Sequence, residues 1–279
     1  MFRFLVDRLP KYRNGDVVSG DSDSNVLADR NPANPYSWTA ASQNLTILLQ
    51  AYDSAEVPAN CIEFPVNCVA LFGISKSLLG AEVEIRRNYP TSGYPATAEY
   101  KAVIGGDRLW IPFDDVCHDD VDNLVTNVAD IQVRVVAAAT GTYSLGELVC
   151  GLTETLRFNF VYGANYGQAV NNTVIPTRGG VDFVYNENAV SRAALSFEWS
   201  QTLNDQDLAL LYRLYDDTGG GLFPFVVIPE DTVRSGPRSC FYGRLPQEFA
   251  RINNFLRRNT HQLEFREAIA YEEPEDVSA

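Results

Sequence analysis

Short segments with strand-like hydrophobic patterning, separated by turn-forming residues, run through most of this sequence. Apolar and polar side chains alternate over residues 81–86 and again over residues 131–136. Continuous apolar runs occur at residues 68–72 and 109–111. An alternating run is typical of a strand with one buried face, and many short strands at close spacing favour an antiparallel sandwich. The sequence therefore predicts a mainly β protein.

One stretch has the period of a helix instead. From Leu208 to Tyr215, apolar or aromatic residues recur at i, i+3, i+4 and i+7. Asn204-Asp205 can cap such a helix, and Gly219–Gly221 can end it. We therefore expect a helix near residues 205–217. The flanking segments are strand-like, which predicts a β-rich α+β domain in the second half of the chain: residues 153–162, 194–199 and 222–229.

The patterning divides the chain into four predicted parts. Residues 1–30 form a turn-rich N-terminal arm, residues 31–150 an antiparallel β-sandwich, residues 151–270 the β-rich domain with the helix, and residues 271–279 an acidic tail. The apolar start of the arm, residues 2–6, has two interpretations. It adds a strand to the sheet edge of a neighbouring chain, or it forms a strand that covers its own domain.

Composition excludes several classes of protein. Hydrophobic residues make up 46% and charged residues 21% of the 279 residues, as in a folded chain rather than a disordered one. The net charge of −14 argues against nucleic-acid binding through the overall field. No run of about 18 apolar residues occurs, so we expect no membrane span. The N-terminus also lacks the apolar core of a secretory signal.

Patterns that indicate catalysis are missing from the sequence. His118 and His261 are the two histidines, so any Ser-His-Asp or Cys-His set would have to use one of them. Neither a GxSxG elbow nor a phosphate-binding glycine motif occurs. We therefore expect that the protein is not an enzyme and that it needs no cofactor. A glycosidase that uses Asp115 or Asp119 is the alternative.

The five cysteines form no CxxC pair, and their spacing does not fit a zinc site. We expect buried free thiols, as in a reducing compartment. A disulfide between Cys61 and Cys68 is the alternative.

An acidic segment runs from Asp114 to Asp122 and holds five carboxylates in nine residues. Oxygen ligands of this kind suit Ca²⁺, although the spacing does not match an EF-hand loop. The segment is interpreted either as a solvated acidic loop or as a calcium site. The candidate ligands are Asp115, Asp119, Asp120 and Asp122.

Two further sets of residues suggest binding surfaces. Tyrosines cluster in a Pro/Gly-rich stretch around residues 89–100, and exposed aromatic rings suit carbohydrate or protein contact. The candidates for a glycan site are Tyr89, Tyr94 and Trp110, with packing over the core as the alternative. Arginines concentrate between residues 234 and 266 of an otherwise acidic chain, and a basic strip can dock an acidic patch. The candidate interface residues are Arg244, Arg251, Arg257 and Arg258.

The first half resembles discoidin or galactose-binding-like β-sandwich domains. The similarity begins with the Asn-rich stretch at residues 31–40, which contains Trp38-Thr39-Ala40, and continues through residues 61–73 and 80–86 to residues 145–148. Glu63-Phe64-Pro65 stands where these domains usually have Asp-Leu-Gly. The resemblance implies a jelly-roll-like sandwich. Because residues 63–65 depart from the family pattern, it does not imply that the ligand site of these domains is retained.

The second half resembles a recurrent module of tailed-bacteriophage tail proteins. The similarity covers residues 195–199, the helical stretch, the glycines at 219–221 and the Pro-bounded strand at 224–229, followed by residues 239–245. The resemblance implies a structural component of the virion tail, made in the host cytoplasm. It would contact other tail proteins and copies of itself, in a ring of three-fold or six-fold symmetry. A carbohydrate-binding protein for adsorption to the host surface is the alternative, and the two roles are compatible.

Overall fold

The computed structural model describes most of the first half of the chain and selected elements of the second half. The described residues are 3–6, 12–19, 27, 35–40, 44–52, 61–62, 64–88, 93–113, 127–136, 141–155, 165–169, 172–176, 182–186, 192–199, 205–219, 223–229, 232, 234–236, 239–244 and 261–267. Antiparallel strands predominate among them, and they confirm the predicted mainly β fold with a sandwich and a β-rich part that carries one helix.

A six-stranded antiparallel sheet forms one layer of the sandwich. Its order is β2-β4-β12-β8-β9, and the short β5 pairs with β4 off this path. Side chains alternate between the two faces, as the sequence pattern predicts, so that Val83 and Ile85 point into the core and Glu82 and Glu84 point outward. The strands are β2 (Tyr12–Ser19), β4 (Asn44–Tyr52), β5 (Cys61–Ile62), β8 (Glu82–Asn88), β9 (Tyr100–Val103) and β12 (Asp130–Val136).

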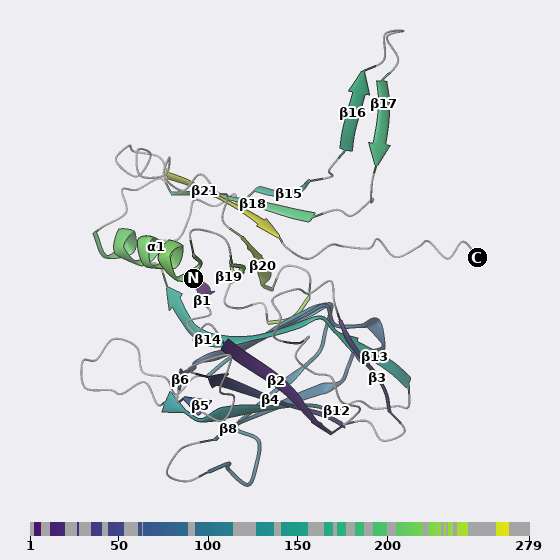
Figure 1. Ribbon diagram of the computed structural model, residues 1–279, viewed down its shortest axis with the longest axis vertical. Coiled ribbons are helices and arrows are strands. Elements are labelled where there is room, and N and C mark those ends of the chain that lie inside the picture. Colours follow the sequence, from purple (N-terminus) through teal and green to yellow (C-terminus); the bar gives the residue numbers. More distant parts are fainter. Residues whose placement is uncertain are drawn as a thin grey trace.

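The second layer belongs to a nine-stranded sheet that continues into the second half of the chain. Its order is β10-β7-β14-β1-β19-β20-β21-β18-β15. Figure 1 shows the sandwich below and the strands of the second half above it. The strands are β1 (Arg3–Val6), β7 (Cys68–Phe72), β10 (Arg108–Pro112), β14 (Glu147–Thr155), β15 (Asn165–Ala169), β18 (Arg192–Trp199), β19 (Phe225–Ile228), β20 (Phe241–Arg244) and β21 (His261–Glu267).

Strand β7 is buried on both faces, because two cores meet at it. On one face, Val69 and Leu71 pack against the six-stranded sheet within the sandwich core. On the other face, Ala70 and Phe72 pack with residues of β19 and β20. The ring of Phe72 stacks on that of Tyr242, with centroids 5.2 Å apart. The continuous apolar run at residues 68–72 has its physical cause in this double burial.

The N-terminal strand joins the two halves. Strand β1 pairs with β14 on one side and with β19 on the other, both antiparallel. Strand β2 pairs with β4 at the edge of the six-stranded sheet. The structure therefore agrees with the second interpretation for the start of the predicted arm, in which residues 2–6 form a strand that pairs within their own chain. The boundary predicted at residue 150 falls inside β14, so the sheet is continuous where we expected a domain junction.

The predicted helix is present as α1 (Asp205–Asp217). Its buried side chains include Leu211 and Leu214, whereas Tyr212 of the predicted apolar stripe is 42% exposed. The chain leaves the helix at Gly219, whose φ of 62° lies in the left-handed region that glycine adopts without strain. None of the helices in the described part of the chain is long and apolar enough to cross a membrane.

Three two-stranded sheets and a 3-10 turn complete the described elements. A hairpin formed by two of these strands, β16 and β17, projects away from the rest of the molecule in Figure 1. The remaining bounds are β3 (Tyr36–Ala40) with β13 (Gly141–Leu145), β6 (Phe64–Pro65) with β11 (Asn127–Val128), β16 (Asn172–Pro176) with β17 (Asp182–Asn186), and η2 (Lys76–Leu78).

Three cysteines are free and buried, namely Cys68, Cys150 and Cys240. Their state agrees with the expectation of buried thiols, and it rules out the alternative disulfide between Cys61 and Cys68. Burial raises the pKa of the Cys68 thiol far above its ordinary value, and the nearby Cys240 adds to the shift. Cys117 and the side chain of Cys61 lie outside the described residues.

Candidate functional site

A polar cluster lies on the outer face of the six-stranded sheet, where β8 ends and β12 begins. Asn88 and Asp130 are paired in the register of these strands. The Asn88 amide Nδ2 donates a hydrogen bond of 2.8 Å to Oδ2 of Asp130. The Tyr94 hydroxyl donates to the other oxygen, Oδ1. The carboxylate is therefore held from two sides, and Asp130 is only 8% exposed.

Tyr94 covers this carboxylate while its ring stays open to solvent. The residue is 37% exposed, which places it among the few large hydrophobic or aromatic residues that the structure leaves exposed. Partial burial and the hydrogen bond to Asp130 raise the pKa of its hydroxyl well above the ordinary value. The hydroxyl therefore remains a protonated donor at neutral pH, and the bond orients the ring.

The next residues along the same face are Arg86 and Gln132, which are opposite each other in the register of β8 and β12. Both are half-buried and share the outward parity of Asn88. We call Arg86, Asn88, Tyr94, Asp130 and Gln132 the outer-face cluster. It combines an exposed aromatic ring with amide, guanidinium and carboxylate groups on a rigid sheet. Such a set can stack on an apolar ligand face and hydrogen-bond to hydroxyl groups around it.

A second set of groups packs on the inner side of the same strand end. Arg87 points inward and is 1% exposed. Its Nη2 lies 3.1 Å from Oε1 of Glu99, and its backbone N–H donates to Oε2 at 2.8 Å. The guanidinium also lies over the rings of Tyr100 and Phe113, at 5.3 and 4.9 Å. This charge is neutralised within the protein, so it supports the 93–100 segment rather than a ligand.

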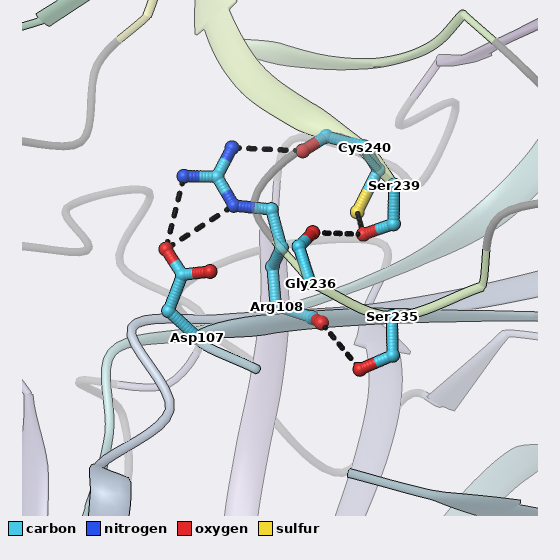
Figure 2. Close-up of polar contacts among 6 residues, drawn as sticks. All are labelled: Asp107, Arg108, Ser235, Gly236, Ser239 and Cys240. Atoms are coloured by element: carbon cyan, nitrogen blue, oxygen red, sulfur yellow. Dashed lines mark hydrogen bonds and ion pairs between the residues drawn. The ribbon is translucent and has the colours of Figure 1, made fainter. Parts of the chain in front are cut away.

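Figure 2 shows another polar cluster, which connects the sandwich to the second half of the chain. Arg108 is fully buried and donates to the carbonyl of Cys240 at 2.9 Å and to Oδ2 of Asp107 at 3.1 Å. Ser235 donates to the carbonyl of Arg108 at 3.1 Å. The guanidinium is engaged by protein groups and excluded from water, so this cluster, the Arg108 clasp, has a structural role.

Of the predicted glycan-binding residues, the structure places Tyr94 in the outer-face cluster. Tyr89 lies outside the described residues. The prediction for Trp110 is wrong, because its side chain is fully buried in the core between β7 and β20. The guanidinium of Arg234 lies 4.2 Å from the centre of the Trp110 ring. Residues 108–111 of strand β10 are all buried, so an aromatic residue among them has no exposed face.

Of the predicted interface arginines and calcium ligands, one lies within the described part of the chain. Arg244 is exposed at the end of β20, as an interface residue would be. Arg251, Arg257 and Arg258 lie outside the described residues, and so does the whole acidic segment with Asp115, Asp119, Asp120 and Asp122. Within the described part of the chain, no group of three or more His, Cys, Asp or Glu side chains could hold a metal ion.

Sequence reasoning missed most of the outer-face cluster. Asn88 and Asp130 are 42 residues apart, and only the pairing of β8 with β12 brings them together. One local signal was available. In the alternating strand Glu82–Asn88, Arg87 occupies an inward position where the pattern calls for an apolar residue. A charged residue at such a position needs a partner, which points to a polar structure at this strand end.

No protein-family model matches this chain, and no curated protein sequence matches it. Among solved structures, it is similar to a Clostridium perfringens module named CBM32-5, in complex with GalNAc-β-1,3-galactose, at 10% identity and a TM-score of 0.38. That match covers 53% of this chain and 99% of the module.

Two other carbohydrate-binding modules from Clostridium perfringens match over a similar share of the chain. A family 32 module in complex with galactose has 12% identity and a TM-score of 0.38, with 55% of this chain and 99% of the module covered. The module CBM32-3 of a family 31 glycoside hydrolase has 14% identity and a TM-score of 0.34, with 53% and 94% covered. The sandwich is defined by the sheet topology and the shared core of this chain itself.

Proposed function

We propose that this protein binds carbohydrate through the outer-face cluster. The observation that carries the proposal is the exposed ring of Tyr94, which is fixed by its hydrogen bond to the buried Asp130. An aromatic ring that is already oriented loses little conformational entropy when a ligand stacks on it. The neighbouring amides of Asn88 and Gln132 offer donors and acceptors to sugar hydroxyls.

Glycan-array screening followed by titration calorimetry tests this function. The wild-type protein should bind a defined set of glycans, and Tyr94→Ala should weaken binding of the best glycan at least about fivefold, because loss of an aromatic contact costs about 1 kcal/mol or more. Tyr212→Ala is the matched control, since Tyr212 is similarly exposed but lies on α1. An array without any bound glycan, or equal losses in the two variants, would remove the proposal.

As a second candidate, we propose that the chain is a structural component of a tailed-phage virion. The projecting hairpin supports an assembly role, because β16 and β17 pair with each other and with no other strand that the structure describes. Exposed strand edges can pair with another chain. Quantitative mass spectrometry of purified particles tests this role. Several copies per particle would support it, and presence in the lysate alone would count against it.

In both candidate roles we propose that the protein binds and does not catalyse. The virion hypothesis further predicts contacts with other tail proteins and with copies of the same chain. The arginine-rich segment between residues 234 and 266 remains the proposed contact. Charge reversal at Arg257 and Arg258 should then impair assembly. We also retain calcium binding by the acidic segment as a prediction. Calorimetric titration with Ca²⁺, repeated on an Asp119→Asn variant, tests it.

A further inference from the structure

The outer face of the six-stranded sheet carries charged residues in successive rows, and one arginine among them differs from the rest. One row contains Glu84 and Arg134, whose side chains pair at 3.1 Å. Lys101 of the neighbouring strand adds a contact of 2.6 Å to Glu84. Lys101 also contacts Glu82 at 2.8 Å, so these two cations and two carboxylates compensate one another within the protein. The next row holds Arg86 opposite Gln132, an uncharged residue.

No carboxylate that the structure describes pairs with Arg86. The carboxylate on the following row, Asp130, is a diagonal neighbour, and its two oxygens accept hydrogen bonds from Asn88 and Tyr94 instead. Other arginines of the described chain are engaged: Arg87 by Glu99, Arg108 by Asp107, Arg134 by Glu84 and Arg213 by Glu154. Arg86 is thus half-buried without an acidic partner among the described residues of a chain whose net charge is −14.

We propose that Arg86 is a specificity-determining residue that receives a carboxylate of the ligand, so that the outer-face cluster selects acidic glycans. The inference rests on the proposed carbohydrate-binding function. Arg86 and Asn88 are two residues apart on one strand, a distance of about 7 Å, which is close to the width of one sugar ring. A sugar stacked on Tyr94 over Asn88 can therefore present a carboxylate to Arg86. The planar guanidinium binds such a group through two parallel N–H···O bonds.

The partners of Asp130 explain why this carboxylate does not repel an acidic ligand from the site. Asp130 is 8% exposed, and its two oxygens accept hydrogen bonds from the Tyr94 hydroxyl and the Asn88 amide. Arg86 is half-buried and presents its guanidinium on the same face of the sheet. The group that an incoming anion meets first is therefore the guanidinium.

The test compares two oligosaccharides that differ only in the terminal residue, a hexose in one and the corresponding hexuronic acid in the other. Calorimetric titration of the full chain should show at least about tenfold tighter binding of the uronic acid, since hydrogen bonds to a charged group contribute about 1.5 kcal/mol or more. The preference should decrease with added salt, because the carboxylate and the guanidinium are partly exposed to solvent.

Arg86→Gln should reduce the ratio of the two affinities to about unity, because it removes the group that pairs with the ligand carboxylate. Arg244→Gln is the matched control, because it removes the same charge from an exposed position on β20 and should leave the preference intact. Equal affinity for the two ligands, or a preference that survives in Arg86→Gln, would overturn the role of Arg86 and leave carbohydrate binding standing. Failure of both ligands and of the array to bind would overturn the proposed function itself.

Discussion

Alanine in place of Gly106 tests the close approach of two backbone segments at the Arg108 clasp. A Cβ atom at Gly106 would lie 2.5 Å from the Cα of Gly236 and 3.0 Å from its backbone nitrogen. The first distance is about 1 Å short of an ordinary carbon–carbon contact. The obstacle is backbone, which has no rotamer to change, so the segment around Gly236 would have to move away from β10.

That movement would strain the hydrogen bonds that hold the 234–236 segment on β10. The Trp110 N–H donates to the carbonyl of Arg234 at 2.9 Å, and the Gly236 N–H donates to that of Arg108 at 3.1 Å. Ser235 adds two more bonds, from the Gly105 N–H at 2.8 Å and to the Arg108 carbonyl at 3.1 Å. At about 0.5–1.5 kcal/mol each, the loss of most of them lowers the free energy of unfolding by about 3 kcal/mol.

Gly105→Ala is the matched control, one residue away. Its Cβ would meet the Ser235 side chain at 3.3 Å, and a serine side chain can adjust by a few tenths of an ångström. We expect a change within about 1 kcal/mol, because the lower entropy of the unfolded chain offsets part of the crowding. Urea denaturation followed by tryptophan fluorescence measures both variants. A loss below about 1 kcal/mol for Gly106→Ala, or equal losses in the two variants, would refute the close approach.

Two further predictions concern charged groups. Arg108→Leu should lower the free energy of unfolding by about 3 kcal/mol, because it leaves the carbonyl of Cys240 without its buried donor. Arg134→Leu should change the free energy of unfolding by no more than about 1 kcal/mol, since that side chain is 37% exposed. Similar losses of unfolding free energy in the two variants would contradict the structural role of the Arg108 clasp. The pKa of Glu84 is lowered, chiefly by a hydrogen bond from Lys101. The Lys101–Glu84 pair therefore stabilises the fold at pH values above the unfolded pKa of Glu84, and this stabilisation is lost as acid protonates Glu84. Hydrogen bonds to Glu82 and Glu84 raise the pKa of Lys101, so its contribution is present below its unfolded pKa and is lost as the pH rises through the folded value. Between pH 7 and about pH 3, the free energy of unfolding should therefore decrease less in Lys101→Met than in the wild type. Urea midpoints that decrease equally in the two proteins would argue against this link between the protonation of Glu84 and stability.

The elements that were predicted correctly are those that depend on neighbours in sequence. The alternation in β8 and β12 gave their inward and outward faces, and the period and final glycines of α1 gave its position. The exposure of Tyr94 was anticipated in the same way, because a tyrosine in a Pro/Gly-rich stretch favours exposure on a loop, and its role in glycan binding stays a prediction. In each case the physical signal lies within about one helical turn or a few strand positions.

Open alternatives and errors arose where the environment of a residue is set by distant parts of the chain. An apolar pattern at residues 2–6 suits any sheet edge, and only the fold places β1 between β14 and β19. Trp110 is buried because β10 has one core on each face, and the second core comes from strands more than 100 residues later. Aromatic composition cannot distinguish such a residue from a surface platform.

The sequence by itself determined the strand-rich class of this protein, the position of helix α1 and the acidic net charge. Tertiary structure alone decided which carboxylates meet which cations. Asp130 is held by Asn88 and Tyr94, and Glu84 pairs with Arg134 and Lys101, so no carboxylate among the described residues pairs with Arg86. The physical reason is that strand register and side-chain reach, which act across dozens of residues, determine whether a charge is compensated within the protein or is available to a ligand.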